Sequence, residues 1–157
     1  MMERMKFEEA IRKFVENCRE KFGDDIVSVV LFGSVAKGAA ERYSDIDLLL
    51  VIKRLPPFNE RIPLISEICY RILIEHKVSI SPILLTPEEF DKGITAGFPL
   101  FLGVITGYKA VFDKGRFSTK LLTKFSETLD REGARFKDGV WTVPNMALKR
   151  QDGYRMD

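Results

Sequence analysis

Two aspartates separated by one residue, Asp45 and Asp47, are the side chains in this sequence with the clearest capacity for chemistry. They open an apolar stretch typical of a strand, and side chains two positions apart on a strand point to the same face. Two carboxylates on one face can grip one divalent cation, which prefers oxygen ligands. The apolar residues Leu49 and Val51 continue that face. The spacing therefore predicts a metal site at the edge of the core.

A Gly-Ser pair, Gly33 and Ser34, precedes the aspartates by ten intervening residues and follows an apolar β-branched run over residues 26–32. Glycine accepts any backbone conformation, so a turn is expected where this strand ends. Ser34 is expected to cap a short helix over residues 35–40, because serine is favoured at that position. The free amides at such a helix start suit a phosphate oxygen. Phosphate that faces carboxylates needs a cation between them, so these residues predict a magnesium-nucleotide site.

The full pattern, G-S-x10-D-x-D with Ala36-Lys37-Gly38 and residues 44–48 inside it, resembles the DNA polymerase β nucleotidyltransferase superfamily. The compact length is similar to that of the minimal nucleotidyltransferases of archaea and bacteria. The motif covers residues 31–51, and a looser likeness of element order extends to about residue 85. The resemblance implies an α/β nucleotidyltransferase fold, in which helices pack on a mixed twisted sheet.

The resemblance also implies a reaction, the transfer of a nucleoside monophosphate from a nucleoside triphosphate to an acceptor hydroxyl. ATP is the first candidate substrate, and Mg²⁺ or Mn²⁺ is the expected metal. By match to the motif, Asp45 and Asp47 are the catalytic and metal-binding residues, whereas Gly33 and Ser34 bind the phosphates. Lys37 stands where the family usually has a basic residue, so it is either a phosphate contact or a solvated helix lysine.

A third carboxylate, which the family carries, is missing from its expected place on the next strand, residues 77–85. Ser79 and Ser81 occupy the candidate positions, and a hydroxyl supplies no negative charge. The cation that activates the acceptor is therefore expected to bind weakly, which slows transfer while nucleotide binding survives. Glu75 and residues 88–89 flank this strand as substitutes, but charges at a helix end and a helix start are the favoured interpretation.

Two functions of different classes are compatible with these residues. The first is an enzyme, a small nucleotidyltransferase that modifies a protein, an RNA end or a small molecule. The second is a catalytically weakened, nucleotide-binding antitoxin with a helical toxin-like partner, a pairing that the resemblance implies. Antibiotic modification is a weaker third option, because it requires a further substrate domain for which the sequence leaves too little room.

The 157 residues are expected to form a single nucleotidyltransferase domain, with a core over about 5–113 and a C-terminal helix and hairpin extension over about 114–157. The net charge of +2 lacks the basic excess of a duplex-binding protein, although a local patch for a nucleic-acid acceptor is compatible with it. No apolar run is long enough to span a membrane and no signal peptide is recognised, so a cytoplasmic protein with Cys18 and Cys69 reduced is expected.

The remaining patterns predict the elements that hold the site in place. Apolar residues at helical spacing predict helices over 5–22 and 62–74. Phe98 and Phe101 are assigned to the core, with stacking on a nucleobase as the alternative. The second half predicts a helix start at Thr86-Pro87-Glu88-Glu89, a core helix or interaction face over 98–106, a strand over 109–113, a helix over 115–132, a hairpin at Asp138-Gly139 and a polar tail beyond Pro144.

Overall fold

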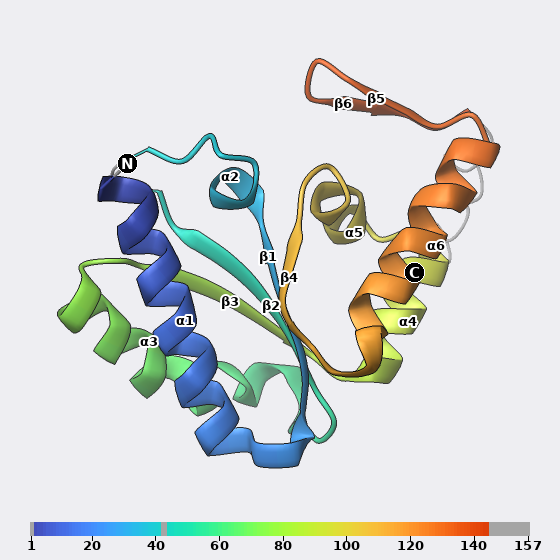
Figure 1. Cartoon of the computed structure of the whole chain (residues 1–157). Helices are drawn as coiled ribbons and strands as arrows, with labels where there is room; N and C mark the ends of the chain where they lie inside the picture. Colours follow the sequence, from blue (N-terminus) through green and yellow to red (C-terminus); the bar gives the residue numbers. More distant parts are fainter. Residues whose placement is uncertain (1, 42–43, 145–157) are drawn as a thin grey trace.

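A four-stranded mixed sheet with helices on both faces forms the centre of the molecule in the computed structural model, which describes residues 2–41 and 44–144 (Figure 1). The strand order is β3-β2-β1-β4. β1 (Ile26–Phe32) is antiparallel to both β2 (Ile46–Ile52) and β4 (Lys109–Asp113). β3 (Ile80–Leu85) is parallel to β2. The predicted mixed α/β sheet is confirmed, and the bounds predicted for the first and fourth strands are those observed.

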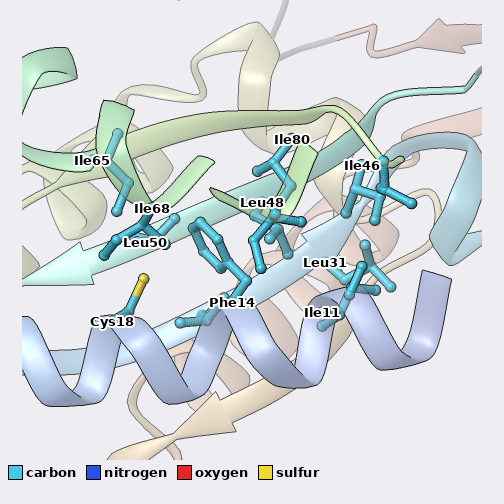
Figure 2. Close-up of a cluster of buried hydrophobic side chains, with 14 of the residues drawn as sticks. Ile11, Phe14, Cys18, Leu31, Ile46, Leu48, Leu50, Ile65, Ile68 and Ile80 are labelled. Carbon is cyan, nitrogen blue, oxygen red and sulfur yellow. The ribbon is translucent and has the colours of Figure 1, made fainter. Parts of the chain in front are cut away.

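Two helices, α1 (Met2–Phe22) and α3 (Ile62–His76), cover one face of the sheet and pack against each other. Ile46, Leu48 and Leu50 point to this face, because alternate side chains of β2 share one side. Figure 2 shows Leu48 and Leu50 beside Phe14 of α1 and Ile68 of α3, with Ile46 farther along the strand near Ile11. Burial of these apolar side chains is the main force that holds the helices to the sheet.

The other face of the sheet carries α4 (Pro87–Ala96), α5 (Pro99–Val104) and α6 (Phe117–Arg131). Leu49 and Val51, which share a face with Asp47, lie in this second cluster. Phe90 and Phe101 pack edge to face there, with ring centroids 5.1 Å apart. The predicted continuation of the carboxylate face into apolar core is therefore confirmed, and so is the core position of Phe101.

Two expectations about these elements are wrong. The third strand begins at Ile80 rather than at residue 77, because Lys77 takes a left-handed conformation (φ 59°) that ends α3 and turns the chain. Phe98 is 50% exposed, because it precedes the first turn of α5 instead of facing the core. The predicted helix start at Thr86 is confirmed, since its hydroxyl and Glu89 form a capping box.

The chain after α6 forms the predicted hairpin of β5 (Arg135–Lys137) and β6 (Val140–Thr142), which turns at Asp138-Gly139. Trp141 ties it to the core, because its indole Nε1 donates to the carbonyl of Leu102 at 3.0 Å. The predicted polar tail lies outside the described residues. Among the described residues, no helix has the length and apolar character needed to cross a membrane. The short elements that complete the fold are η1 (Gly23–Asp25), α2 (Gly33–Ala36), η2 (Phe58–Glu60) and η3 (Lys114–Arg116).

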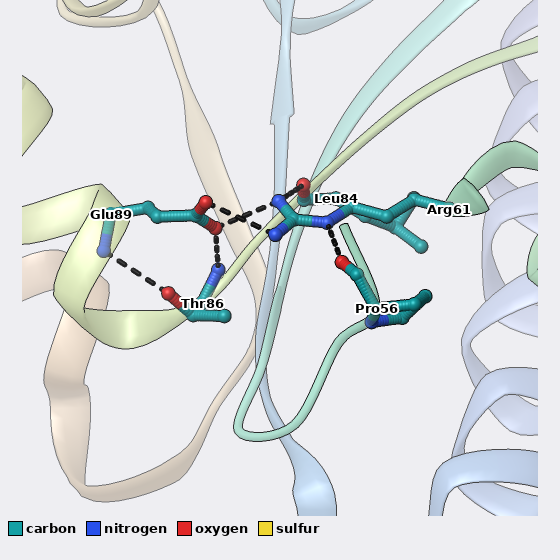
Figure 3. A network of polar contacts seen from close by, with 5 residues as sticks. All are labelled: Pro56, Arg61, Leu84, Thr86 and Glu89. Carbon is teal, nitrogen blue, oxygen red and sulfur yellow. Dashed lines mark hydrogen bonds and ion pairs between the residues drawn. The ribbon is translucent and has the colours of Figure 1, made fainter. Parts of the chain in front are cut away.

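A buried arginine, Arg61, fastens the end of the sheet where β2 and β3 finish (Figure 3). Its guanidinium donates to both carboxylate oxygens of Glu89, at 2.8 and 3.1 Å. It also donates to the carbonyls of Pro56 and Leu84, at 2.9 and 3.1 Å. The starts of α3 and α4 and the end of β3 are therefore joined through one side chain.

Candidate active site

The turn after β1 brings the chain directly against an aspartate of β2. Gly33 has a φ of +75°, which a residue with a side chain rarely adopts. A Cβ added at Gly33 would overlap the Oδ2 atom of Asp47 and lie 3.1 Å from its Cγ. The backbone of the Gly-Ser turn and the carboxylate of Asp47 are therefore neighbours, which only glycine permits at this position.

The two aspartates lie at the start of β2, in the middle of the sheet. Asp47 pairs with Phe32 of β1, and Asp45 precedes the strand. Asp47 is half-buried and Asp45 is exposed. Burial and then the charge of Asp45 raise the pKa of Asp47, so the two carboxylates are close enough to repel each other. A divalent cation between them would remove this repulsion, and their oxygen donors are the type that Mg²⁺ prefers.

Ser34 lies inside α2 rather than at its cap, which corrects the sequence-based expectation. The helix begins at Gly33, and the residue at the cap position is Phe32, which makes no side-chain cap. The helix starts two residues early because Gly33 folds back from the strand, so that its carbonyl already accepts from the amide of Lys37 at 3.2 Å. The helix is also shorter than expected, since it ends at Ala36 rather than at residue 40. The backbone of Gly33 nonetheless lies against the side chain of Asp47.

Lys37 follows α2 and reaches across to two residues much later in the chain. A Cβ added at Gly107 would lie 2.8 Å from the Lys37 Cγ, so the aliphatic stem of Lys37 packs on the backbone of Gly107. The Nζ atom lies 5.9 Å from the ring centroid of Phe136 in the hairpin. Lys37 is thus held by contacts on its stem and its ammonium, rather than extending freely into solvent.

The position next to Asp47 on β3 is occupied by Ser81, its direct partner in the parallel pair. Ser79 precedes the strand, and its carbonyl accepts from the amide of Ile46 at 2.9 Å. Among the described residues, no group of three His, Cys, Asp or Glu side chains is arranged to hold a metal ion. The structure thus brings Ser81 to the side of Asp47 and places no third acid there.

The glutamates considered as substitutes stand elsewhere. Residues 88–89 follow Leu85, which pairs with Val51 at the far end of β2, and Glu89 is engaged with Arg61. Glu75 lies in the last turn of α3, with its carboxylate 4.0 Å from the His76 ring. Their interpretation as charges at helix ends is therefore in keeping with the structure.

The sequence did not point to Gly107 or Phe136 as neighbours of the motif. Both contact Lys37 across long chain separations, and neither lies in a recognisable pattern. The register of β1 and β4 explains the first contact, because Leu31 pairs with Lys109 and so brings residue 107 beside α2. Such a contact depends on sheet order, which local patterns do not encode.

This arrangement combines a backbone turn, two carboxylates and a lysine at one end of the sheet. Backbone amides and an ammonium suit phosphate oxygens, and paired carboxylates suit a divalent cation. The site can therefore accommodate the metal complex of a polyphosphate. Similarity to known proteins identifies the family to which the chain belongs.

Residues 11–109 match the family model described as the nucleotidyltransferase domain. Two relatives come from Methanocaldococcus jannaschii, both named as candidate protein adenylyltransferases. The first, MJ1305, is 37% identical over 76% of this chain and 80% of its own length. The second, MJ0604, is 32% identical over 60% of this chain and 88% of its own length. These identities extend well beyond the short motif around the aspartates.

Solved structures share the fold at low sequence identity. The MNT antitoxin in a complex with a tri-AMPylated HEPN toxin of Shewanella oneidensis has a TM-score of 0.53 and 14% identity, covering 95% of this chain and 96% of that one. A spectinomycin adenyltransferase of Enterococcus faecialis has a TM-score of 0.50 and 14% identity, covering 78% of this chain and 66% of that one. The resemblance to nucleotidyltransferases is confirmed, and this chain belongs to the nucleotidyltransferase domain family.

Proposed function

We propose that this protein transfers the AMP moiety of ATP to a hydroxyl group of a protein acceptor, with Mg²⁺ or Mn²⁺ held by Asp45 and Asp47. The observation that carries the proposal is the contact between the Gly33 backbone and the Asp47 carboxylate. It joins a phosphate-binding turn to a cation-binding pair within one site. Burial and then the charge of Asp45 raise the pKa of Asp47, and this supports the same assignment because a bound cation would relieve the repulsion between the two carboxylates.

Each residue of the site has a definite part in this proposal. The amides of Gly33 and Ser34 bind the phosphates of the nucleotide, and the ammonium of Lys37 neutralises charge on the phosphates that leave. Asp45 and Asp47 would hold the cation beside the α-phosphate. A cation bound there would polarise the phosphoryl oxygen and lower the pKa of the acceptor hydroxyl. The acceptor oxygen forms a bond to the α-phosphorus, pyrophosphate departs, and the hydroxyl proton is released to solvent.

The hydroxyl at Ser81 limits this chemistry. It stands beside Asp47 but carries no charge, so a second cation would have two carboxylates to bind it rather than three. The protein is therefore expected to bind nucleotide well but to transfer the AMP group slowly.

The choice of a protein acceptor rests on the relatives. The M. jannaschii protein that is 37% identical is named as a candidate protein adenylyltransferase, and the two chains align over most of their lengths. The fold shared with an MNT antitoxin, found with an AMPylated toxin, favours a second candidate function. In that alternative this chain is an antitoxin that binds nucleotide and a helical toxin, with little transfer of its own.

Calorimetric titration of the purified protein with ATP, CTP, GTP and UTP, each with and without Mg²⁺, tests the nucleotide site. Tight binding of ATP that depends on Mg²⁺ is expected in the native protein. Asp45→Asn should abolish that dependence while leaving the circular dichroism spectrum unchanged, because Asp45 is exposed at the rim. Equal ATP binding by the native and Asp45→Asn proteins would contradict the metal assignment.

Transfer is tested separately with ATP labelled in its α- or its γ-phosphate, mixed with proteins encoded beside the gene. Label from the α-phosphate alone on a protein band supports adenylylation. Label from the γ-phosphate would indicate a kinase and contradict the proposal. Mg²⁺-dependent binding together with a stable complex but no labelled band would favour the antitoxin alternative.

A further inference from the structure

A groove of about 920 Å³ is lined by the first part of α1, by the end of α2 and the residues after it, and by the start of β4. Figure 1 shows where these elements lie. It lies apart from the carboxylates, since neither Asp45 nor Asp47 lines it. The volume falls in the upper part of the range of ligand-binding pockets. The candidate active site uses none of its residues except Lys37, which borders both.

The floor of the groove is apolar and its rim is basic. Among the described residues, four of the five charged side chains that line it are positive, namely Arg4, Arg12, Lys37 and Lys109, and Glu8 is the acid. This positive excess is larger than the net charge of +2 of the whole chain. The floor consists of Phe7, Ile11, Val15, Leu31, Val35, Ala36, Ala40, Ala110 and Val111. Such a surface complements a ligand that combines negative charge with apolar side chains.

The basic side chains are free to accept a new partner. Arg4 is 84% exposed and pairs with Glu8 at 3.1 Å, while Arg12 is 67% exposed and pairs with Glu16 at 3.4 Å. Exposed pairs one helical turn apart are worth only about 0.3–0.5 kcal/mol, so an arriving carboxylate replaces them at little cost. Lys109 is exposed as well.

A polypeptide fits this groove better than a nucleic acid. Single-stranded nucleic acid is held by exposed aromatic side chains on which the bases stack. Of the described residues that line the groove, one is aromatic, Phe7, and it is only 5% exposed. An extended peptide can instead form backbone hydrogen bonds with β4. This strand lies at the edge of the described sheet, so its outer backbone groups face no further strand of that sheet.

The ends of the groove give it a direction. At one end Arg19 lies over the ring of Phe112, with its Cζ 4.8 Å from the centroid, and so bridges α1 to β4. At the other end the groove is lined by residues 35–38, directly after the Gly33-Ser34 turn. A segment that lies in the groove therefore runs toward the end of the sheet that carries the two aspartates.

We infer that this groove is the docking site for an acidic, apolar segment of the protein acceptor. This inference rests on the proposed function for the identity of the acceptor, and the groove recognises the segment through its charge and its apolar side chains. The acceptor hydroxyl is then carried by the part of the chain that extends past α2 to the carboxylates.

Fluorescence anisotropy with three labelled probes tests the inference. The first probe is an octapeptide of alternating Glu and Leu, the second is the same peptide with Lys in place of Glu, and the third is an RNA octanucleotide. We expect the acidic peptide to bind best, with an affinity that falls as salt is raised. The variant Arg12→Glu/Lys109→Glu should bind it at least about tenfold more weakly, because it reverses two rim charges.

The matched control is Lys92→Glu/Lys124→Glu, which makes the same change in net charge on exposed residues of α4 and α6 outside the groove. Its affinity for the acidic peptide should stay within about twofold of the native value. Failure of the acidic peptide to bind, equal loss in the control, or tighter binding of RNA or of the basic peptide would each overturn the inference. Thermal melts confirm that all variants are folded.

Calorimetry with Mg²⁺ and ATP on the same variants separates this inference from the proposed function. Neither substitution in the groove variant touches the turn or the aspartates, so ATP affinity should be unchanged. Absence of ATP binding in every protein, with the peptide pattern intact, would refute the proposed function and leave a peptide-binding groove. Normal ATP binding with no preference for the acidic peptide would refute only the groove.

Discussion

Glu89 and Asp47 are carboxylates near opposite ends of the parallel pair β2 and β3, and they differ in the charged side chain that each one faces. Glu89 receives two hydrogen bonds from Arg61. Burial alone would raise the pKa of Glu89, but the hydrogen bonds from Arg61 and Thr86 outweigh it and lower that pKa. Asp47 faces Asp45 instead, and burial together with that charge raises its pKa. At one end of the sheet a carboxylate is neutralised by an arginine of the same chain, and at the other end two carboxylates face each other.

The comparison shows how a small domain separates stability from chemistry. The Arg61 network satisfies every polar group that it touches, as a stabilising joint requires. The repulsion between the two aspartates costs stability, and on the proposed function a bound cation would offset that cost. Substitutions at the first end should therefore affect unfolding, whereas substitutions at the second should affect binding.

Arg61→Leu should have the largest effect, a loss of about 2–4 kcal/mol in the free energy of unfolding. It leaves two carbonyls without their donor and removes the cation from Glu89. Urea unfolding followed by circular dichroism measures the loss. The control is Arg54→Leu, which removes an 85% exposed partner of Asp25 and should leave the free energy of unfolding nearly unchanged, because solvent screens an exposed ion pair. Similar losses in both variants would show that the network is not a joint.

Gly33→Ala should combine a moderate loss of stability with loss of the site. The left-handed conformation costs a residue with a side chain about 1–2 kcal/mol, and the new methyl group would displace the Asp47 carboxylate. Gly38→Ala is the matched control, since its φ is +71° and nothing lies within 4 Å of the added Cβ. Both variants should lose similar stability in urea. Calorimetry should find Mg²⁺-dependent ATP binding lost in Gly33→Ala alone, and its retention there would separate the turn from the metal site.

Ser81→Asp should place a third carboxylate beside Asp45 and Asp47. Because Ser81 pairs with Asp47, the new carboxylate would strengthen cation binding by roughly 1 kcal/mol or more and speed transfer of the α-phosphate label. Ser79→Asp should have the smaller effect, since Ser79 precedes the strand. Mn²⁺ titration by electron paramagnetic resonance measures the affinity. No gain in either variant would mean that the missing acid does not limit the site.

Asp47→Asn and Glu89→Gln should produce the smallest effects, with opposite signs. The pKa of Asp47 is raised on folding, so its ionised form destabilises the fold at neutral pH, and this cost is relieved as pH falls through the raised pKa. Asp47→Asn should therefore raise the free energy of unfolding of the metal-free protein slightly at pH 7, and this gain should vanish in acid.

Glu89 behaves in the reverse way, because its pKa is lowered on folding. The stability that it contributes is present above the unfolded pKa and is lost as pH falls through the lowered one. Glu89→Gln should be less stable than the native protein at pH 7, with a difference that shrinks in acid. Thermal melts between pH 3 and pH 7 measure both variants, and shifts of the same sign would contradict the comparison.

Most of the sheet could be predicted from local patterns, because alternation and turn residues act within a few positions. The run from Ile26 to Phe32, the strand at Lys109–Asp113 and the Asp138-Gly139 hairpin all follow such signals. Lys77 escaped prediction because a lysine rarely adopts positive φ, and nothing local distinguishes it from the first residue of a strand.

The aspartate motif was recognisable because its residues are close in sequence, whereas the surroundings of the motif were not. The contact of Lys37 with Phe136, the pair of Arg61 with Glu89 and the basic groove each join distant segments. Their formation depends on strand order and helix placement, which only the folded chain reveals.

The position of Asp47 has one more consequence, for the dynamics of the site. Asp47 lies in β2, one of the two central strands of the sheet, and pairs with Phe32 of β1 and with Ser81 of β3. Amides in such positions exchange with solvent only when the whole domain opens, whereas loops and helix ends open locally. Asp47, one of the two proposed metal ligands, is therefore anchored in the slowest-exchanging part of the protein. Heating should abolish nucleotide binding only at the temperature at which the fold itself is lost.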